Sequence, residues 1–146
     1  MVDKRIEQMI RQRQLERVSP NPGHAANVLE TASRHLQTAR LLAQTDDHAM
    51  AFTAAYDATR KALAGVLATE GLRVRPVGGA HRNTGIAAAL FVDDAALGEF
   101  EWMRQVRNAT EYPDEGRPTA TRQDVKDSIE AASDIVAACR TYLSTR

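Results

Sequence analysis

Apolar residues recur every three or four positions along most of the chain, which is the period of a helix that faces a core. The clearest stripe consists of Phe52, Tyr56, Thr59, Leu63 and Val66, at alternating steps of four and three. No stretch alternates apolar and polar positions for long enough to predict a strand. The pattern therefore predicts an all-α protein, an antiparallel helical bundle of about five to six helices joined by short connections.

Prolines and a glycine separate the first stripe from the others. Ile6, Met9 and Ile10 predict an amphipathic helix over residues 2–17, and the sequence Ser-Pro-Asn-Pro-Gly at 19–23 ends it. We therefore divide the chain into an N-terminal amphipathic helix with its linker, residues 1–19, and a helical bundle, residues 20–146.

Capping residues set the other boundaries. Residues 45–47, Thr-Asp-Asp, offer N-caps to the central helix, and Gly71 is placed as its C′ residue. Pro113 disfavours helix at the preceding residue, and Thr121 with Asp124 approximates a capping box. The remaining elements expected in chain order are a loop over 72–80, a short helix over 81–91, a helix over 93–111, a polar loop over 114–120 and a last helix.

Composition narrows the function classes. The chain has 146 residues, 43% hydrophobic and 26% charged, which indicates one globular domain rather than a disordered chain. Its formal net charge is zero, so a role with nucleic acid must depend on a local basic patch. The apolar stretches are far shorter than the roughly 20 residues of a membrane span, and we expect no membrane association. The single Cys139 and four histidines predict no disulfide, metal site or cofactor, and a cytoplasmic location.

The helix expected over residues 93–111 has a stripe that begins apolar and ends polar. In order, this face presents Leu97, Phe100, Arg104, Arg107, Asn108 and Glu111. Two interpretations stay open. Arg107 and Glu111 form an ordinary surface ion pair at i,i+4, or the stripe faces a polar cleft that binds phosphate or RNA, because guanidinium groups match phosphate oxygens bidentately.

Residues 104–113, Arg-Gln-Val-Arg-Asn-Ala-Thr-Glu-Tyr-Pro, resemble the signature helix end of HEPN domains. Residues 55–63, Ala-Tyr-Asp-Ala-Thr-Arg-Lys-Ala-Leu, are similar to the core helix of the same family. HEPN domains are all-α bundles of prokaryotic toxin–antitoxin, abortive-infection and RNA-processing systems. The resemblance covers residues 23–143 and is closest to the subgroup whose motif reads Arg-Asn-x-x-Glu-Tyr-Pro.

This resemblance implies a metal-independent ribonuclease, or a degenerate relative of one, that acts on RNA as a homodimer. Ribonuclease members carry an arginine, a polar residue directly after it, and a histidine four to six residues on. Arg107 and Asn108 match the first two, but no histidine follows Arg104 or Arg107 at that spacing. Glu111 would then act as the base, and Arg107, supported by Arg104, would stabilise the charge on the phosphate.

A second branch of the family pairs with a co-encoded nucleotidyltransferase that transfers AMP to a tyrosine. Tyr112 stands for that tyrosine if Thr110 occupies the histidine position; the opposing interpretation is a Tyr112 ring packed at the helix end. A catalytically silent helical dimer is the third hypothesis. His81 is the best substitute for the missing histidine. Arg82, with the arginines of the preceding loop, contacts phosphates or belongs to a solvated connection.

Overall fold

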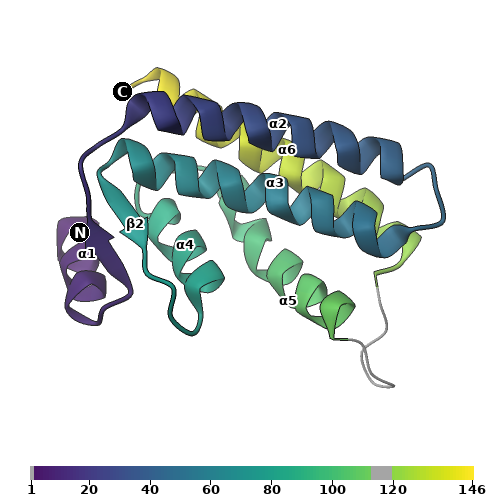
Figure 1. Cartoon of the computed structure of the whole chain (residues 1–146), viewed down its shortest axis with the longest axis horizontal. Helices are drawn as coiled ribbons and strands as arrows, with labels where there is room; N and C mark the ends of the chain where they lie inside the picture. Colours follow the sequence, from purple (N-terminus) through teal and green to yellow (C-terminus); the bar gives the residue numbers. More distant parts are fainter. Residues whose placement is uncertain (1, 113–119) are drawn as a thin grey trace.

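The computed structural model of the chain describes residues 2–112 and 120–146 (Figure 1). Within them the chain forms six α-helices, one 3-10 helix and one ribbon of two short strands. This confirms the all-α prediction. The elements are α1 (Val2–Arg11), β1 (Leu15–Arg17), α2 (Pro22–Leu42), α3 (His48–Thr69), β2 (Leu72–Val74), α4 (Ala80–Ala89), η1 (Ala95–Glu99), α5 (Phe100–Glu111) and α6 (Arg122–Ser144).

The helix α3 occupies the centre of the bundle. It packs against α2 and α6 on one side and against the shorter α4 and α5 on the other (Figure 1). A short turn makes α2 antiparallel to α3, whereas α4, η1 and α5 carry the chain back so that α6 runs in the same direction as α3. At the crossing of α2 and α3, a Cβ on Gly65 would come within 2.5 Å of the Leu29 side chain, so glycine permits this close approach.

The stripe predicted for the central helix is confirmed. Phe52, Tyr56, Thr59, Leu63 and Val66 all have no exposed surface. Burial of four large side chains on a single helix removes much apolar area from water, the main favourable term in folding. The position of α3 therefore follows directly from the spacing of its apolar residues.

The predicted caps are confirmed as well. The Asp47 carboxylate accepts a hydrogen bond from Met50 N at 3.1 Å and so begins α3. Thr121 and Asp124 form the complete capping box of α6, with distances of 3.1 and 3.0 Å. Gly71 follows α3 at φ +71°, a left-handed conformation that favours glycine. A Cβ there would also lie 2.8 Å from Val18 O.

The prediction that residues 2–17 form one helix is wrong. The helix α1 ends at Arg11, Arg13 adopts φ +60°, and the chain continues into β1. The strand β1 pairs antiparallel with β2, with Glu16 opposite Arg73, so β2 also interrupts the loop expected over residues 72–80. Strands of three residues are too short to show an alternating pattern, and the sequence does not reveal a partner 57 positions away.

Other boundaries shift by a few residues. The helix α2 begins at Pro22, inside the expected break, because proline is compatible with the first helical position and Asn21 caps His24 N at 3.0 Å. The helix expected over 93–111 is η1 followed by α5, and its cap is Asp94, which accepts from Ala96 N at 2.9 Å. The short helix expected over 81–91 is α4, Ala80–Ala89. Pro113 and most of the polar loop expected over 114–120 lie outside the described residues.

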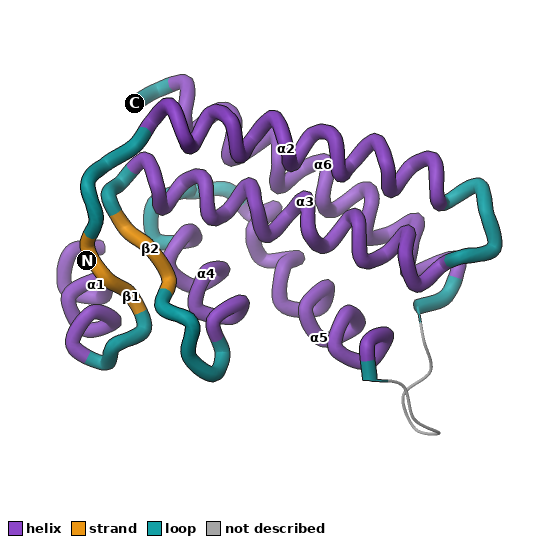
Figure 2. Tube along the Cα trace, viewed as in Figure 1, coloured by secondary structure: helices purple, strands orange, loops and turns teal. Residues whose placement is uncertain are grey.

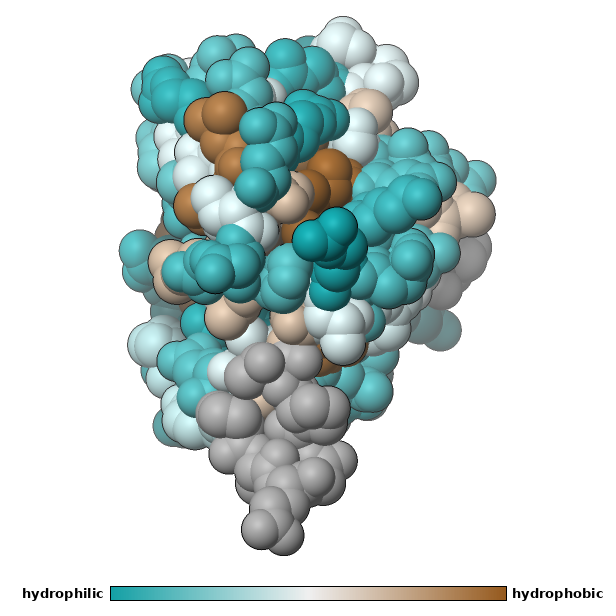
Figure 3. All heavy atoms as spheres, turned by 90° about the vertical axis from the view of Figure 1, so that its right-hand side faces the viewer, coloured by the Kyte–Doolittle hydropathy of each residue, from teal (hydrophilic) through white to brown (hydrophobic). Residues whose placement is uncertain are grey.

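The N-terminal segment packs on the bundle. Ile6, Met9 and Leu15 are at most 3% exposed and belong to the same hydrophobic core as α3. Figure 2 shows the two strands between α1 and α4. At the opposite end, where α2 joins α3, most of the surface is hydrophilic around a small hydrophobic area (Figure 3). None of the helices in the described residues is long and apolar enough to cross a bilayer.

Candidate functional site

The polar stripe of α5 leaves the core beside α3. Leu97 and Phe100, at its start, are buried at 7% and 4% exposure. One and two turns later, the side chains of Arg104 and Arg107 keep only 22% and 24% of their surface exposed. These guanidinium groups are half-buried at the edge of the bundle, so Arg107 is not a freely solvated member of a surface ion pair.

Tyr56, from the middle of α3, connects this stripe to the rest of the site. Its ring is fully buried and stacks on Phe100, with centroids 5.5 Å apart and an interplanar angle of 9°. The Arg107 guanidinium carbon lies 5.7 Å from the centroid of the same ring, a cation–π distance. Burial raises the pKa of Tyr56 to about 12, so its hydroxyl remains protonated at neutral pH.

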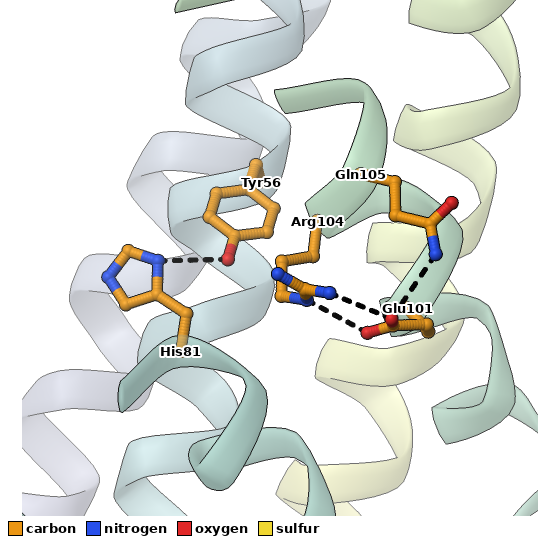
Figure 4. A network of polar contacts seen from close by, with 5 residues as sticks. All are labelled: Tyr56, His81, Glu101, Arg104 and Gln105. Carbon is orange, nitrogen blue, oxygen red and sulfur yellow. Dashed lines mark hydrogen bonds and ion pairs between the residues drawn. The ribbon is translucent and has the colours of Figure 1, made fainter. Parts of the chain in front are cut away.

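His81, at the start of α4, reaches the same tyrosine. Its Nδ1 lies 3.0 Å from the Tyr56 hydroxyl (Figure 4). The helices α4 and α5 approach closely because Gly85 faces Phe100, whose ring a Cβ would meet at 2.5 Å. Desolvation, followed by the charge of Arg60, lowers the pKa of His81, and Arg107 and Arg104 act in the same direction. The fold therefore places an imidazole, neutral at pH 7, beside the arginines of the motif.

Arg104 is held by a carboxylate on its own helix. Its Nε and one terminal nitrogen each donate to Glu101 at 2.8 Å, and Gln105 donates to the same carboxylate at 3.3 Å (Figure 4). The hydrogen bonds from Arg104 lower the pKa of Glu101 to about 2. In Figure 4 the Arg104 side chain lies between Glu101 and Tyr56, so this pair fixes the guanidinium next to the Tyr56 hydroxyl.

Arg107 is paired with Glu111, as the simpler interpretation predicts, but the pair is part of the site. One terminal nitrogen of Arg107 contacts the Glu111 carboxylate. The Nε of Arg107 is buried and has no hydrogen-bond partner among the described residues. Asn108, the polar neighbour in the motif, is half-buried, and its carbonyl accepts from Tyr112 N at 3.0 Å. The Arg107 side chain as a whole is 24% exposed, so a ligand can contact it from the surface of the bundle.

The other predicted residues lie farther from this cluster. Tyr112 is 72% exposed, so the interpretation as a packed ring is wrong. The Thr110 hydroxyl accepts a hydrogen bond from Ala120 N at 3.1 Å and has a structural role. Arg82 is exposed on α4, and its charge contributes to lowering the pKa of Glu101.

Sequence reasoning missed two members of the site. The sequence pattern places Tyr56 in the apolar stripe of the central helix and does not distinguish Glu101. The available signal was a hydroxyl-bearing ring in a stripe that otherwise carries no polar aromatic residue, since a buried tyrosine hydroxyl needs a partner. Glu101 stands three residues before Arg104, a spacing at which helix side chains pair.

Two further features lie outside this site. Cys139 is fully buried, and burial raises its pKa to about 12, so the thiol is unreactive. A groove of about 670 Å³ between η1 and α6 is lined by Asp93, Asp94, Glu99 and Asp134 and by no basic residue. Across the described residues, no group of three or more His, Cys, Asp or Glu side chains is arranged to hold a metal ion.

Comparison with known protein families identifies the domain that carries this site. The family model of the HEPN domain matches residues 25–142. The chain belongs to the HEPN family. No curated protein and no solved structure matches it. All members of the site lie inside the matched region of the HEPN domain, whereas α1, β1 and the start of α2 precede it.

Proposed function

We propose that this HEPN domain is a metal-independent endoribonuclease in which His81 replaces the histidine missing from the motif. The observation that supports the proposal is that His81 and Arg107, far apart in sequence, both contact Tyr56. His81 lies within hydrogen-bond distance of the Tyr56 hydroxyl, and the Arg107 guanidinium lies over the Tyr56 ring. A role in a toxin–antitoxin or phage-defence system, acting in the cytoplasm, is part of the same proposal.

The chemistry assigned to each residue follows from its position. With Nδ1–H donating to the Tyr56 oxygen, the Nε2 lone pair of His81 is available to take the proton of a ribose 2′-OH. The 2′-oxygen then attacks the adjacent phosphorus, and the bond to the 5′-oxygen breaks. Arg107 and Arg104 stabilise the charge that develops on the phosphate. Protonated His81 returns the proton to the leaving 5′-oxygen, which completes the reaction. Glu111 remains the alternative base.

The direct test is the substitution Arg107→Ala in a cleavage assay with EDTA present. We expect wild-type activity to persist in EDTA, because each proposed role is filled by a side chain. Arg107→Ala is expected to lower the rate by about 10²- to 10³-fold, the effect of losing one donor to a developing oxyanion. The matched control is Arg122→Ala, an exposed arginine at the start of α6, whose rate should equal the wild type. Full activity of Arg107→Ala contradicts the proposed site.

We also propose that the protein acts as a homodimer through the face that carries Arg104, Arg107 and Glu111. A two-fold axis near the end of α5 would bring both copies of these half-buried charges to one cleft. Light scattering at micromolar concentration is expected to give the dimer mass. A monomer at that concentration contradicts the shared cleft and leaves the site of a single protomer in place.

A second candidate function rests on the exposure of Tyr112. Its hydroxyl is accessible to a partner enzyme, as an AMP acceptor must be. The Tyr112 oxygen would attack the α-phosphorus of ATP bound to a co-encoded nucleotidyltransferase and displace pyrophosphate. Mass spectrometry after incubation with that enzyme is expected to show one added AMP, which should be absent in Tyr112→Phe. The control is Tyr142→Phe, which should still carry the AMP. In the wild type the Tyr142 hydroxyl donates a hydrogen bond to Glu70. AMP on Tyr112→Phe contradicts this candidate.

A further inference from the structure

A pocket of about 570 Å³ lies between the N-terminal segment and the bundle, next to the site just described. Its wall is formed by the connection from β1 to α2, the second half of α3, the strand β2 and the start of α4. Figure 2 shows β2 running between α3 and α4 at this end of the molecule. The volume is that of pockets that hold small organic ligands.

The charged side chains that line the pocket are all basic or imidazole. They are Arg60, Arg73, Arg75, His24 and His81, and no carboxylate belongs to the lining. Two carboxylates that do not belong to the lining balance part of this charge. Glu16 pairs with Arg73 and lies 3.9 Å from Arg75 Nε, and Asp57 lies 3.9 Å from Arg60. Three guanidinium groups thus share two carboxylates.

Arg60 and Arg75 have donors left over. The Nε of each is buried and has no hydrogen-bond partner among the described residues. The side chains as a whole are 31% and 41% exposed, so a ligand in the pocket reaches the guanidinium groups through their accessible nitrogens rather than through the buried Nε. Both residues line the pocket, and guanidinium groups bind phosphate oxygens by paired hydrogen bonds.

The floor of the pocket is apolar. Leu67 and Leu72 are 2% and 3% exposed, and Ala64, Ala68 and Val74 complete this surface. A fully hydrated ion such as inorganic phosphate would leave this floor without contacts. The lining therefore fits a ligand that combines an anionic group with an apolar body.

The pocket is a feature of this chain rather than of the HEPN bundle alone. Val18, Ser19 and Asn21 belong to the wall but precede the residues that match the family. They are held in place by Val18 N donating to Gly71 O at 2.9 Å and Asn21 N donating to Ala68 O at 3.0 Å. The ribbon of β1 and β2 adds two arginines to the same wall. Arg73 lies in β2, and Arg75 follows the strand directly.

We propose that this pocket binds a small organic phosphate that carries an apolar ring, with the phosphate on Arg60 and Arg75 and the ring on Leu67 and Leu72. The proposal is independent of RNA cleavage, although His81 belongs to both sites. Phenyl phosphate is the simplest molecule with this chemistry. Inorganic phosphate carries the anionic group alone, and benzyl alcohol carries a neutral aromatic ring alone.

The test is isothermal titration of the full chain with phenyl phosphate, inorganic phosphate and benzyl alcohol. We expect phenyl phosphate to bind at least ten-fold more tightly than either of the other two. Arg75→Gln, which removes one guanidinium group and its charge from the wall, is expected to weaken the binding of phenyl phosphate by at least ten-fold. Arg40→Gln, an exposed arginine on α2, is the matched control and should bind as the wild type does. Equal binding of phenyl phosphate by Arg75→Gln and the wild type overturns the proposal.

A second variant separates the apolar contact from the charge. Ala64→Leu places a larger side chain in the pocket. This variant is expected to weaken the binding of phenyl phosphate and to leave the affinity for inorganic phosphate unchanged. Thermal melting establishes that both variants are folded. Arg107→Ala distinguishes this pocket from the proposed ribonuclease site, since it should retain phenyl phosphate binding even where RNA cleavage is lost. Loss of binding in Arg107→Ala, with normal binding in Arg75→Gln, assigns the ligand to the other site and overturns the proposal.

Discussion

The substitution His81→Asn is expected to lower the rate of RNA cleavage by about 10²- to 10⁴-fold, the range for loss of a general base. Asparagine places an amide nitrogen close to the position of Nδ1, so the contact with the Tyr56 hydroxyl is retained, while the Nε2 lone pair is lost. The matched control is His24→Asn, an exposed histidine at the start of α2, which should cleave RNA at the wild-type rate. Cleavage by His81→Asn at the wild-type rate would return the role of base to Glu111.

The pH profile provides a second measurement of the same role. Burial is the largest cause of the lowered pKa of His81, and the facing charges of Arg60, Arg107 and Arg104 reinforce it against the opposing effect of Asp57. The base must be neutral to take a proton, so the rate should rise with pH through a midpoint below 6.5 and then stay level through pH 8. A midpoint above 6.5 contradicts the assignment of His81 as the base.

The substitution Leu63→Ala is expected to lower the free energy of unfolding by about 2–5 kcal/mol, measured by chemical denaturation. Leu63 has no exposed surface and lies on α3, the central helix, so its truncation leaves a cavity in the core. The matched control is Leu41→Ala near the end of α2, where the side chain is 66% exposed. Both variants make the same change in helix propensity, and the control should change stability by no more than about 0.5 kcal/mol.

Equal stability losses in the two variants would mean that Leu63 is not part of the core. Denaturation profiles that differ in slope would instead report a change in the unfolded or native ensemble. The comparison therefore separates the effect of burial on the free energy of unfolding from the effect of replacing leucine by alanine in a helix.

The sequence predicted the helices well where a feature repeats locally. The stripe through Phe52 and Leu63, the cap at Asp47 and the capping box at Thr121 each depend on residues within one or two helical turns. Such patterns are visible in the local spacing of residues, so the helices and their caps can be predicted without knowledge of the fold.

The sequence failed where a structural feature needs a distant partner. The ribbon joins Glu16 to Arg73, and neither three-residue strand has a pattern of its own. The same limit applies to the candidate site. The sequence shows Arg104 and Arg107 as polar members of a helical stripe. Only the packing of α3, α4 and α5 on one another shows that Tyr56 and His81 lie at the same place. Contacts between helices depend on crossing geometry, which local spacing does not define.

The acidic groove between η1 and α6 gives the molecule an uneven distribution of charge, which its composition does not reveal. The formal net charge is zero, yet Asp93, Asp94, Glu99 and Asp134 gather in that groove with no basic residue in its lining. The arginines of α3, β2 and α5 gather around the site and the neighbouring pocket, where their paired carboxylates balance only part of their charge. Separated charges of opposite sign make an electric dipole, whose field persists outside the protein over about one Debye length, roughly 8 Å at physiological salt. A polyanion such as RNA would therefore be turned toward the arginines as it approaches, and added salt would slow its association with a protein that carries no net charge.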